Sequence, residues 1–177
     1  MRALIMYESI FGNTQRIARA IAEGLTGHAR TTVTEVGDAP ARLDTEWELL
    51  VIGGPTHMWG MSRPNTRADA GRQSPATPVS PGIGIREWLS HLPPGRPGLA
   101  TATFDTRLGK PWWLTGSAAR SAAKALRERG YPVVARESFT VLGTAGPLRA
   151  EEVERARQWG VRLTRMSAAA HSGPIVH

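Results

Sequence analysis

The chain has 177 residues, which is the size of one domain with a substantial hydrophobic core. Cysteine is absent, so disulfides and thiolate metal sites are excluded and a reducing compartment is expected. The formal net charge is +7, yet there is no run of consecutive Lys or Arg and no recognisable nucleic-acid module, so we expect a solvated basic surface and no nucleic-acid partner.

The sequence also argues against export and membrane insertion. Its N-terminus has no signal-peptide pattern, because the apolar run after Arg2 is short and is followed by polar residues. No stretch approaches the roughly 20 apolar residues of a membrane span. A soluble cytoplasmic protein is expected.

The first third of the sequence alternates strands with one helix. An apolar run at 2–7 predicts a buried strand, and apolar residues at helical spacing from Ile17 to Leu25 predict an amphipathic helix that starts at Asn13 and is closed by Gly27. A weaker strand is expected at 31–36. The clearest strand of the sequence is predicted at 48–55, where it ends in a glycine pair and a proline.

Two unusual segments follow this strand. Residues 55–62 combine aromatic and apolar side chains with a turn, which is uncommon in a plain solvent loop. Residues 64–82 are rich in Pro, Ser, Thr and Arg and hold few apolar residues, so we expect a mobile loop insertion there. A short helix is predicted at 84–92.

The second half of the sequence continues the alternation. Its predicted elements are a strand at 99–105, a helix at 117–129, a strand at 133–142 and a helix at 150–166. The chain is therefore expected to form one domain over residues 1–166. Residues 167–177 are expected to be a disordered tail.

Five strands that alternate with helices predict an α/β fold with a parallel sheet and helices on both faces. In such sheets a ligand binds outside the carboxyl ends of the strands, where the strand order reverses. The loops at those ends are 9–14, 55–62 and 105–113. We therefore expect a ligand site that these three loops share.

The first of these loops has the features of an anion site. It is a small, hydroxyl-rich turn with one glycine, placed between a strand and a helix N-terminus, where free N–H groups and the helix dipole favour an anion. It has no lysine and no G-x-G-x-x-G pattern, which leaves a terminal phosphate monoester as the expected ligand. An ordinary connection with Ser9 or Asn13 as the N-cap is the alternative.

The other two loops carry aromatic and apolar side chains that could hold a planar ring between them, with stacking worth of the order of 1 kcal/mol per face. These side chains are His57, Met58, Trp59, Phe104, Trp112 and Trp113. A phosphate at one end and a planar heterocycle at the other describe flavin mononucleotide (FMN).

The sequence resembles flavodoxins and flavodoxin-like proteins over nearly its whole length. Residues 9–14 (Ser-Ile-Phe-Gly-Asn-Thr) are similar to the T-x-T-G-x-T phosphate loop of the family, and residues 53–57 (Gly-Gly-Pro-Thr-His) are similar to its G-[ST]-P-T-[YW] ring loop. Residues 146–148 (Gly-Pro-Leu) look like the segment before the last helix in short flavodoxin domains. Phe11 and His57 depart from the pattern, and the basic charge differs from the acidic surface typical of flavodoxin electron carriers.

The resemblance implies a short-chain flavodoxin-like three-layer sandwich with strand order 2-1-3-4-5 and bound FMN. Ser9 and Thr14 would donate hydroxyl hydrogen bonds to the phosphate, and the backbone of 104–107 would meet the pyrimidine edge. The cofactor-binding residues implied are Ser9, Ile10, Phe11, Gly12, Asn13, Thr14, Pro55, Thr56, His57, Met58, Trp59, Gly60, Phe104, Asp105, Thr106, Arg107 and Trp112.

Several individual roles stay open. Asp105 would either accept a hydrogen bond from the flavin or cap its own loop, and His57 is either a flavin neighbour or an ordinary loop residue. The histidines share no metal-like spacing, so no metal is expected, and no catalytic residue can be assigned.

The resemblance implies electron transfer through a bound flavin, with a redox partner protein. One alternative is an FMN-dependent NAD(P)H:quinone reductase of the same fold. Another is a flavodoxin-like module that has lost FMN and serves in binding or regulation.

Overall fold

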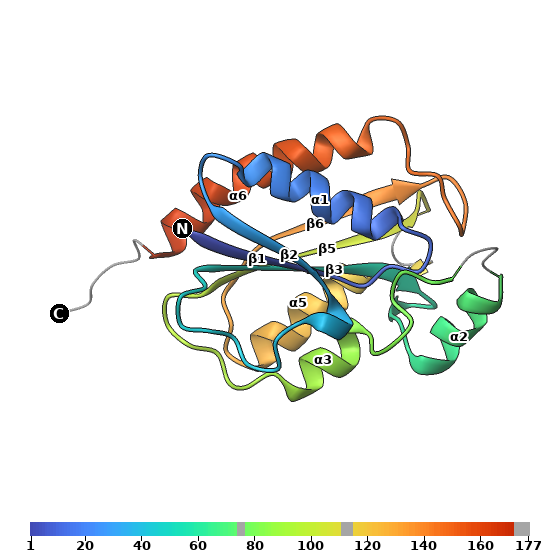
Figure 1. Cartoon of the computed structure of the whole chain (residues 1–177), viewed down its shortest axis with the longest axis horizontal. Coiled ribbons are helices and arrows are strands. Elements are labelled where there is room, and N and C mark those ends of the chain that lie inside the picture. The colour runs from blue at the N-terminus through green and yellow to red at the C-terminus, as the bar shows by residue number, and fades with distance from the viewer. Residues whose placement is uncertain (74–76, 111–114, 172–177) are drawn as a thin grey trace.

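The computed structural model describes residues 1–73, 77–110 and 115–171. A parallel β-sheet lies between two layers of helices, as Figure 1 shows. The strands of this sheet are β1 (Arg2–Tyr7), β2 (Arg30–Glu35), β3 (Leu49–His57), β5 (Ala100–Leu108) and β6 (Val133–Val141).

The strand order is β2-β1-β3-β5-β6, with every neighbouring pair parallel. It confirms the predicted order 2-1-3-4-5 for the five predicted strands. A further short strand, β4 (Gly60–Met61), pairs antiparallel with the end of β3 and was not predicted. The order reverses at β1 and β3, so the carboxyl ends of these strands border the place where a ligand site is expected.

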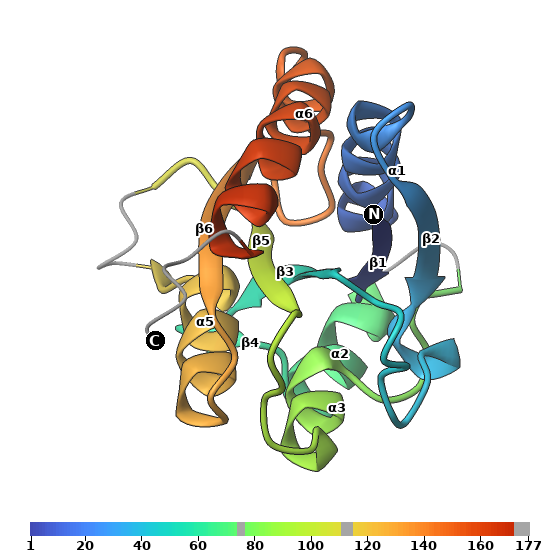
Figure 2. The ribbon, with the colours of Figure 1, turned by 90° about the vertical axis from the view of Figure 1, so that its left-hand side faces the viewer.

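Two hydrophobic cores fill the space between the sheet and the helices. Helices α1 (Asn13–Leu25) and α6 (Glu152–His171) cover one face, and α3 (Ile85–His91) and α5 (Ala118–Glu128) cover the other, as the end view in Figure 2 shows. Strand β1 serves both cores because successive side chains point to opposite faces. Ala3 and Ile5 belong to the core under α1 and α6, and Leu4 and Met6 belong to the other core.

The structure corrects the prediction of a loop over 64–82, because residues Pro64–Gln73 form helix α2. The sequence has few apolar residues here, and polar contacts hold α2 in place instead of apolar packing. Thr66 Oγ1 accepts a hydrogen bond from the Arg63 amide, and the Arg67 guanidinium lies 3.0 Å from Glu87 on α3. Local composition carries no information about such contacts between segments.

The last helix also differs from its predicted range. Helix α6 ends at His171, so the part of the expected tail over 167–171 is helical. Alanines 168–170 favour a helix, and they continue it beyond the last large apolar residue. Residues 172–177 lie outside the described residues.

Within the described ranges, none of the helices has the length and apolar character needed to cross a membrane. The same residues hold no cluster of three or more His, Asp or Glu side chains that could bind a metal ion.

Candidate functional site

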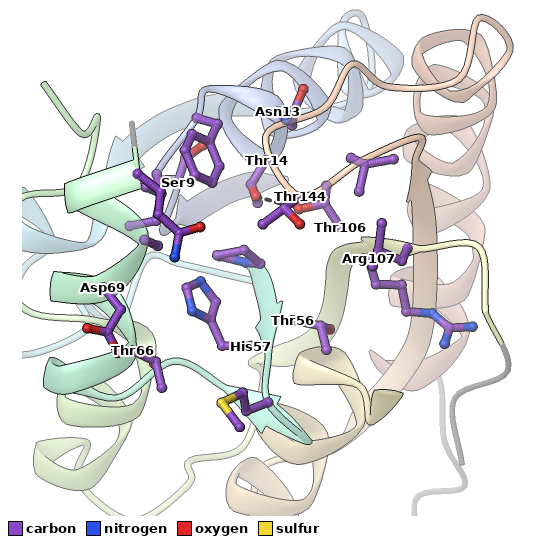
Figure 3. Close-up of a pocket in the computed structure, with 18 residues that line it drawn as sticks. Ser9, Asn13, Thr14, Thr56, His57, Thr66, Asp69, Thr106, Arg107 and Thr144 are labelled. Carbon is purple, nitrogen blue, oxygen red and sulfur yellow. Dashed lines mark hydrogen bonds between the residues drawn. The ribbon is translucent and has the colours of Figure 1, made fainter. Parts of the chain in front are cut away.

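A pocket of about 440 Å³ opens at the carboxyl edge of the sheet (Figure 3). Its volume lies within the range of small-molecule sites, about 300–1,000 Å³. The loop between β1 and α1 forms one part of its lining, the end of β3 a second, the ends of β5 and β6 a third, and α2 a fourth. The three loops predicted to share a site therefore all border it.

Ser9 contributes a buried hydroxyl to this pocket. The residue is 1% exposed, and its Oγ has no hydrogen-bond partner among the described residues. Its backbone is occupied: the amide donates to Ser80 Oγ at 2.9 Å, and the carbonyl accepts from the Ser80 amide at 2.8 Å. Buried polar groups in proteins are almost always paired, so this hydroxyl points to a partner that the pocket would supply.

The N-terminus of α1 lies next to Ser9. Its N-cap is Gly12, with φ 84° and no side-chain cap hydrogen bond, so the interpretation of Ser9 or Asn13 as the N-cap is wrong. The side-chain amide of Asn13 instead donates, through Nδ2, to the Ala145 carbonyl at 3.0 Å, across to the loop after β6. Helix N-terminal N–H groups without a side-chain acceptor are suited to binding an anion.

Thr14 and Thr106 join the first loop to the end of β5. Their Oγ1 atoms lie 2.8 Å apart, and both residues line the pocket. Because one hydroxyl donates within the pair, the other keeps its proton for a second acceptor. The pair therefore offers one hydrogen-bond donor to a ligand.

The end of β3 supplies Pro55, Thr56, His57 and Met58 to the pocket. Thr56 is held by two hydrogen bonds, because its hydroxyl donates to Asp105 at 3.0 Å and accepts from the Ala118 amide at 2.9 Å. Figure 3 shows His57 between the α2 side of the pocket and the side formed by β5 and β6.

Burial lowers the pKa of His57 below its ordinary value of 6.5, the positive charge of Arg67 lowers it further, and a hydrogen bond to the Thr66 backbone opposes the shift. The imidazole is therefore neutral near pH 7. A neutral imidazole has one nitrogen that donates and one that accepts, so His57 brings a hydrogen-bond acceptor as well as a flat surface to the pocket.

Two of the predicted site residues, Phe104 and Asp105, lie within β5 and have other roles in the structure. The Phe104 ring is buried in the core, with edge contacts to Phe139 and Trp159 at centroid distances of 6.2 and 6.3 Å. The Asp105 carboxylate is buried and accepts from the Ser117 hydroxyl at 2.6 Å and from the Ala119 amide at 3.0 Å. These partners lie at the N-terminus of α5, so Asp105 binds the start of that helix rather than capping its own loop as one interpretation had it.

Most other predicted residues border the pocket. Those in its lining are Ser9, Ile10, Phe11, Asn13, Thr14, Pro55, Thr56, His57, Met58, Thr106 and Arg107. Gly12, Trp59, Gly60, Phe104 and Asp105 are near it in the chain but outside that lining. Trp112 lies outside the described residues.

Sequence reasoning missed the contribution of α2 and of the end of β6. Helix α2 adds Thr66, Asp69, Ala70 and Gln73, and the β6 side adds Val141 and Thr144, with Leu108 completing the lining from β5. The polar residues of α2 could not be predicted as site residues, because the composition of the segment indicated an exposed loop. The alternation of strands and helices placed the end of β6 at the correct edge, but no side chain there stood out.

A buried polar network lies behind the pocket. Glu8, the residue before Ser9, accepts from the Ile85 amide at 2.9 Å, and burial raises the pKa of its carboxyl. Arg67 of α2 donates to the Ser62 hydroxyl at 2.9 Å and pairs with Glu87. These contacts fix both the first loop and α2 to the region around α3.

The strand order and the two helix layers define the class of flavodoxin-like α/β proteins. The family model "Flavodoxin" matches residues 5–74, which include both loops that carry the resemblance. The resemblance to flavodoxins is thus confirmed. No curated protein is similar enough to match this chain.

Solved structures agree on the fold. A flavodoxin from the domain Archaea has 19% sequence identity and a TM-score of 0.61, and the match covers 95% of this chain and 99% of that one. Oxidised flavodoxin 1 from Bacillus cereus has 20% identity and a TM-score of 0.61, with 93% and 98% covered. The flavodoxin of Streptococcus pneumonia TIGR4 has 18% identity and a TM-score of 0.63, with 96% and 99% covered.

Proposed function

We propose that the pocket binds FMN and that the protein transfers electrons through the bound flavin. The observation that carries this proposal is the unpaired, buried Ser9 hydroxyl beside the uncapped N-terminus of α1. A phosphate monoester supplies the acceptor oxygens that both features lack. The flavodoxin resemblance and the position at the strand-order reversal support the same ligand.

The residues present fit the parts of FMN. The Ser9 hydroxyl and the backbone N–H groups of the loop at Gly12 would hold the phosphate. The Thr14–Thr106 pair would donate one hydrogen bond, and His57 with Leu108 would border the ring. Bound flavin supplies one- and two-electron redox chemistry, while the chain fixes its orientation and limits the access of water.

The phosphate assignment is tested with Ser9→Ala. Losing a hydrogen bond to a charged group costs about 1.5–3 kcal/mol, so FMN affinity should fall at least about tenfold, while riboflavin affinity should change little. Flavin fluorescence titration gives both dissociation constants. Ser90→Ala, which removes an exposed hydroxyl on α3, is the matched control. Equal losses for FMN and riboflavin would remove Ser9 from the phosphate site.

The redox assignment needs a second measurement. After photoreduction, the FMN-loaded protein should be reoxidised by a protein electron acceptor, and NADPH alone should not bleach the flavin absorbance. Rapid bleaching by NADPH, followed by turnover with a quinone, would favour the reductase alternative. Absence of flavin binding at saturating FMN would leave the binding-module alternative.

A further inference from the structure

The three most exposed large apolar residues of the described chain belong to segments that border the pocket. They are Met58, Trp59 and Leu142, with 79%, 65% and 63% of their surface exposed. Met58 lines the pocket from the end of β3, Trp59 is the next residue, and Leu142 follows Val141, which lines the pocket from the end of β6. Large exposed apolar residues that cluster at one place mark interaction sites more often than scattered ones do.

The backbone holds Trp59 in its exposed position. Its φ is 76°, a left-handed conformation that a bulky side chain rarely adopts. A bridge to Gly116 fixes this turn, and a Cβ on Gly116 would lie 2.3 Å from the Trp59 carbonyl carbon, so glycine is required there. Strained backbone of this kind persists where the surrounding structure enforces it, often at functional sites.

The segments that border the pocket also carry cations. The segments that border the mouth carry Arg63, just after β4, and Arg107 and Lys110, after β5. None of these three cations forms an ion pair with a residue that the structure describes. The acidic residues of the same region, Asp69 and Glu151, each lie beside an arginine of their own, Arg72 and Arg149. The mouth therefore has a net positive charge.

We infer that this surface docks an electron-transfer protein whose own contact surface is acidic. The surface, here called the mouth surface, consists of Met58, Trp59, Leu142, Arg63, Arg107 and Lys110. Tryptophan, methionine and arginine are enriched in protein interfaces, and tryptophan and arginine are also enriched in their energetic hot spots. This inference rests on the proposed function, since a protein docked here would sit against the opening of the flavin pocket.

The charge decides between possible occupants. A second copy of this chain would place the same cations against each other, and like charges across an interface cost several kcal/mol. Carboxylates on a different protein would neutralise Arg63, Arg107 and Lys110 and would speed association by long-range attraction. The apolar centre would then supply most of the affinity once the two proteins touch.

The test uses two probe proteins of opposite charge, an acidic [2Fe–2S] ferredoxin and the basic cytochrome c. Fluorescence anisotropy of the labelled probe measures its binding to the FMN-loaded protein. We expect binding to ferredoxin that weakens at least about tenfold between about 0.01 M and about 0.15 M NaCl, where the Debye length falls from about 30 to about 8 Å. We expect weaker binding to cytochrome c at both salt concentrations. Preference for cytochrome c, or no dependence on salt, would overturn the inference.

Variants locate the contact. Arg63→Glu combined with Lys110→Glu should lower ferredoxin affinity at least about tenfold, and Trp59→Ala should do the same with less dependence on salt. Val161→Ala and Arg165→Glu on α6 are the matched controls, because these residues belong to a helix that contributes nothing to the described lining of the pocket. If the two sets of variants have equal effects, the partner docks elsewhere.

The two proposals fail in different ways. Flavin absorbance reports FMN occupancy, and the anisotropy titration is repeated on protein stripped of flavin. Ferredoxin binding without flavin binding would support the docking surface and contradict the proposal that FMN is the cofactor. Flavin binding with no preference for ferredoxin would support FMN as the cofactor and contradict the docking surface.

Discussion

His57 links the environment of the pocket to the stability of the protein. Its pKa is lowered in the folded state by burial and by Arg67, whereas the unfolded chain binds a proton near pH 6.5. Below about pH 6.5, His57 therefore binds a proton more readily in the unfolded state than in the folded state. The free energy of unfolding consequently falls as the pH falls.

His57→Gln should flatten this pH dependence between about pH 6.5 and pH 5. Urea unfolding at several pH values measures it, and an NMR titration of the His57 imidazole checks its pKa directly. An imidazole that titrates above 6.5 in the folded protein would contradict the assigned environment.

Single residues also show what the sequence could reveal about the site. The hydroxyl loop and the Pro-Thr-His segment were predicted because both follow parallel strands at the edge where ligands bind, and because both resemble loops of flavodoxins. Phe104 was misplaced because its position within β5 directs its ring into the core. The ring occupies the space beside Gly53, where a Cβ would lie 2.0 Å from Phe104 Cζ. The glycine of the ring-loop motif thus makes room for the core as well.

Among the elements, helix α2 is the one that was predicted as a loop. It is held by contacts with residues outside the helix. Its anchor is Arg67, which is mostly buried and bonds to Ser62 and Glu87. Arg67→Ala would leave the Glu87 carboxylate and the Ser62 hydroxyl without this partner. We expect the free energy of unfolding to fall by about 2–3 kcal/mol. Because α2 lines the pocket, FMN affinity should fall as well.

Arg72→Ala is the control, since Arg72 is exposed on the same helix and pairs with Asp69 at the surface. An exposed pair contributes about 0–1 kcal/mol. Chemical denaturation and FMN titration compare the two variants. Equal effects would show that α2 is held by its backbone and apolar contacts rather than by the Arg67 pair.

For the whole molecule, the topology could be predicted and the shape of the pocket could not. Alternating strands and helices, together with right-handed crossovers, predict a parallel sheet with helices on both faces, and the resemblance to flavodoxins implied its strand order. The pocket depends on where α2 packs, and that position is set by Arg67 and Glu87, which are 20 residues apart in the chain. No local pattern contains such a pairing.

The hydrogen bonds between Ser80 and Ser9 have a consequence for the motions of the chain. Val79 and Ser80 donate to the carbonyls of Ile10 and Ser9, so the segment that follows α2 is tied directly to the loop proposed to hold the phosphate. Opening this segment would require the loop to give up those bonds. An anion that stabilises the loop should therefore slow the opening of the segment as well.

Hydrogen–deuterium exchange with and without saturating inorganic phosphate measures this coupling. We expect the amides of Val79 and Ser80 to exchange more slowly when phosphate is bound, although their donor groups point to the loop rather than to the ligand. The Arg30 amide, which donates to the Met1 carbonyl at the opposite edge of the sheet, should not change. The phosphate loop and the chain after α2 would then act as one cooperative unit, in which occupation of the first sets the rigidity of the second.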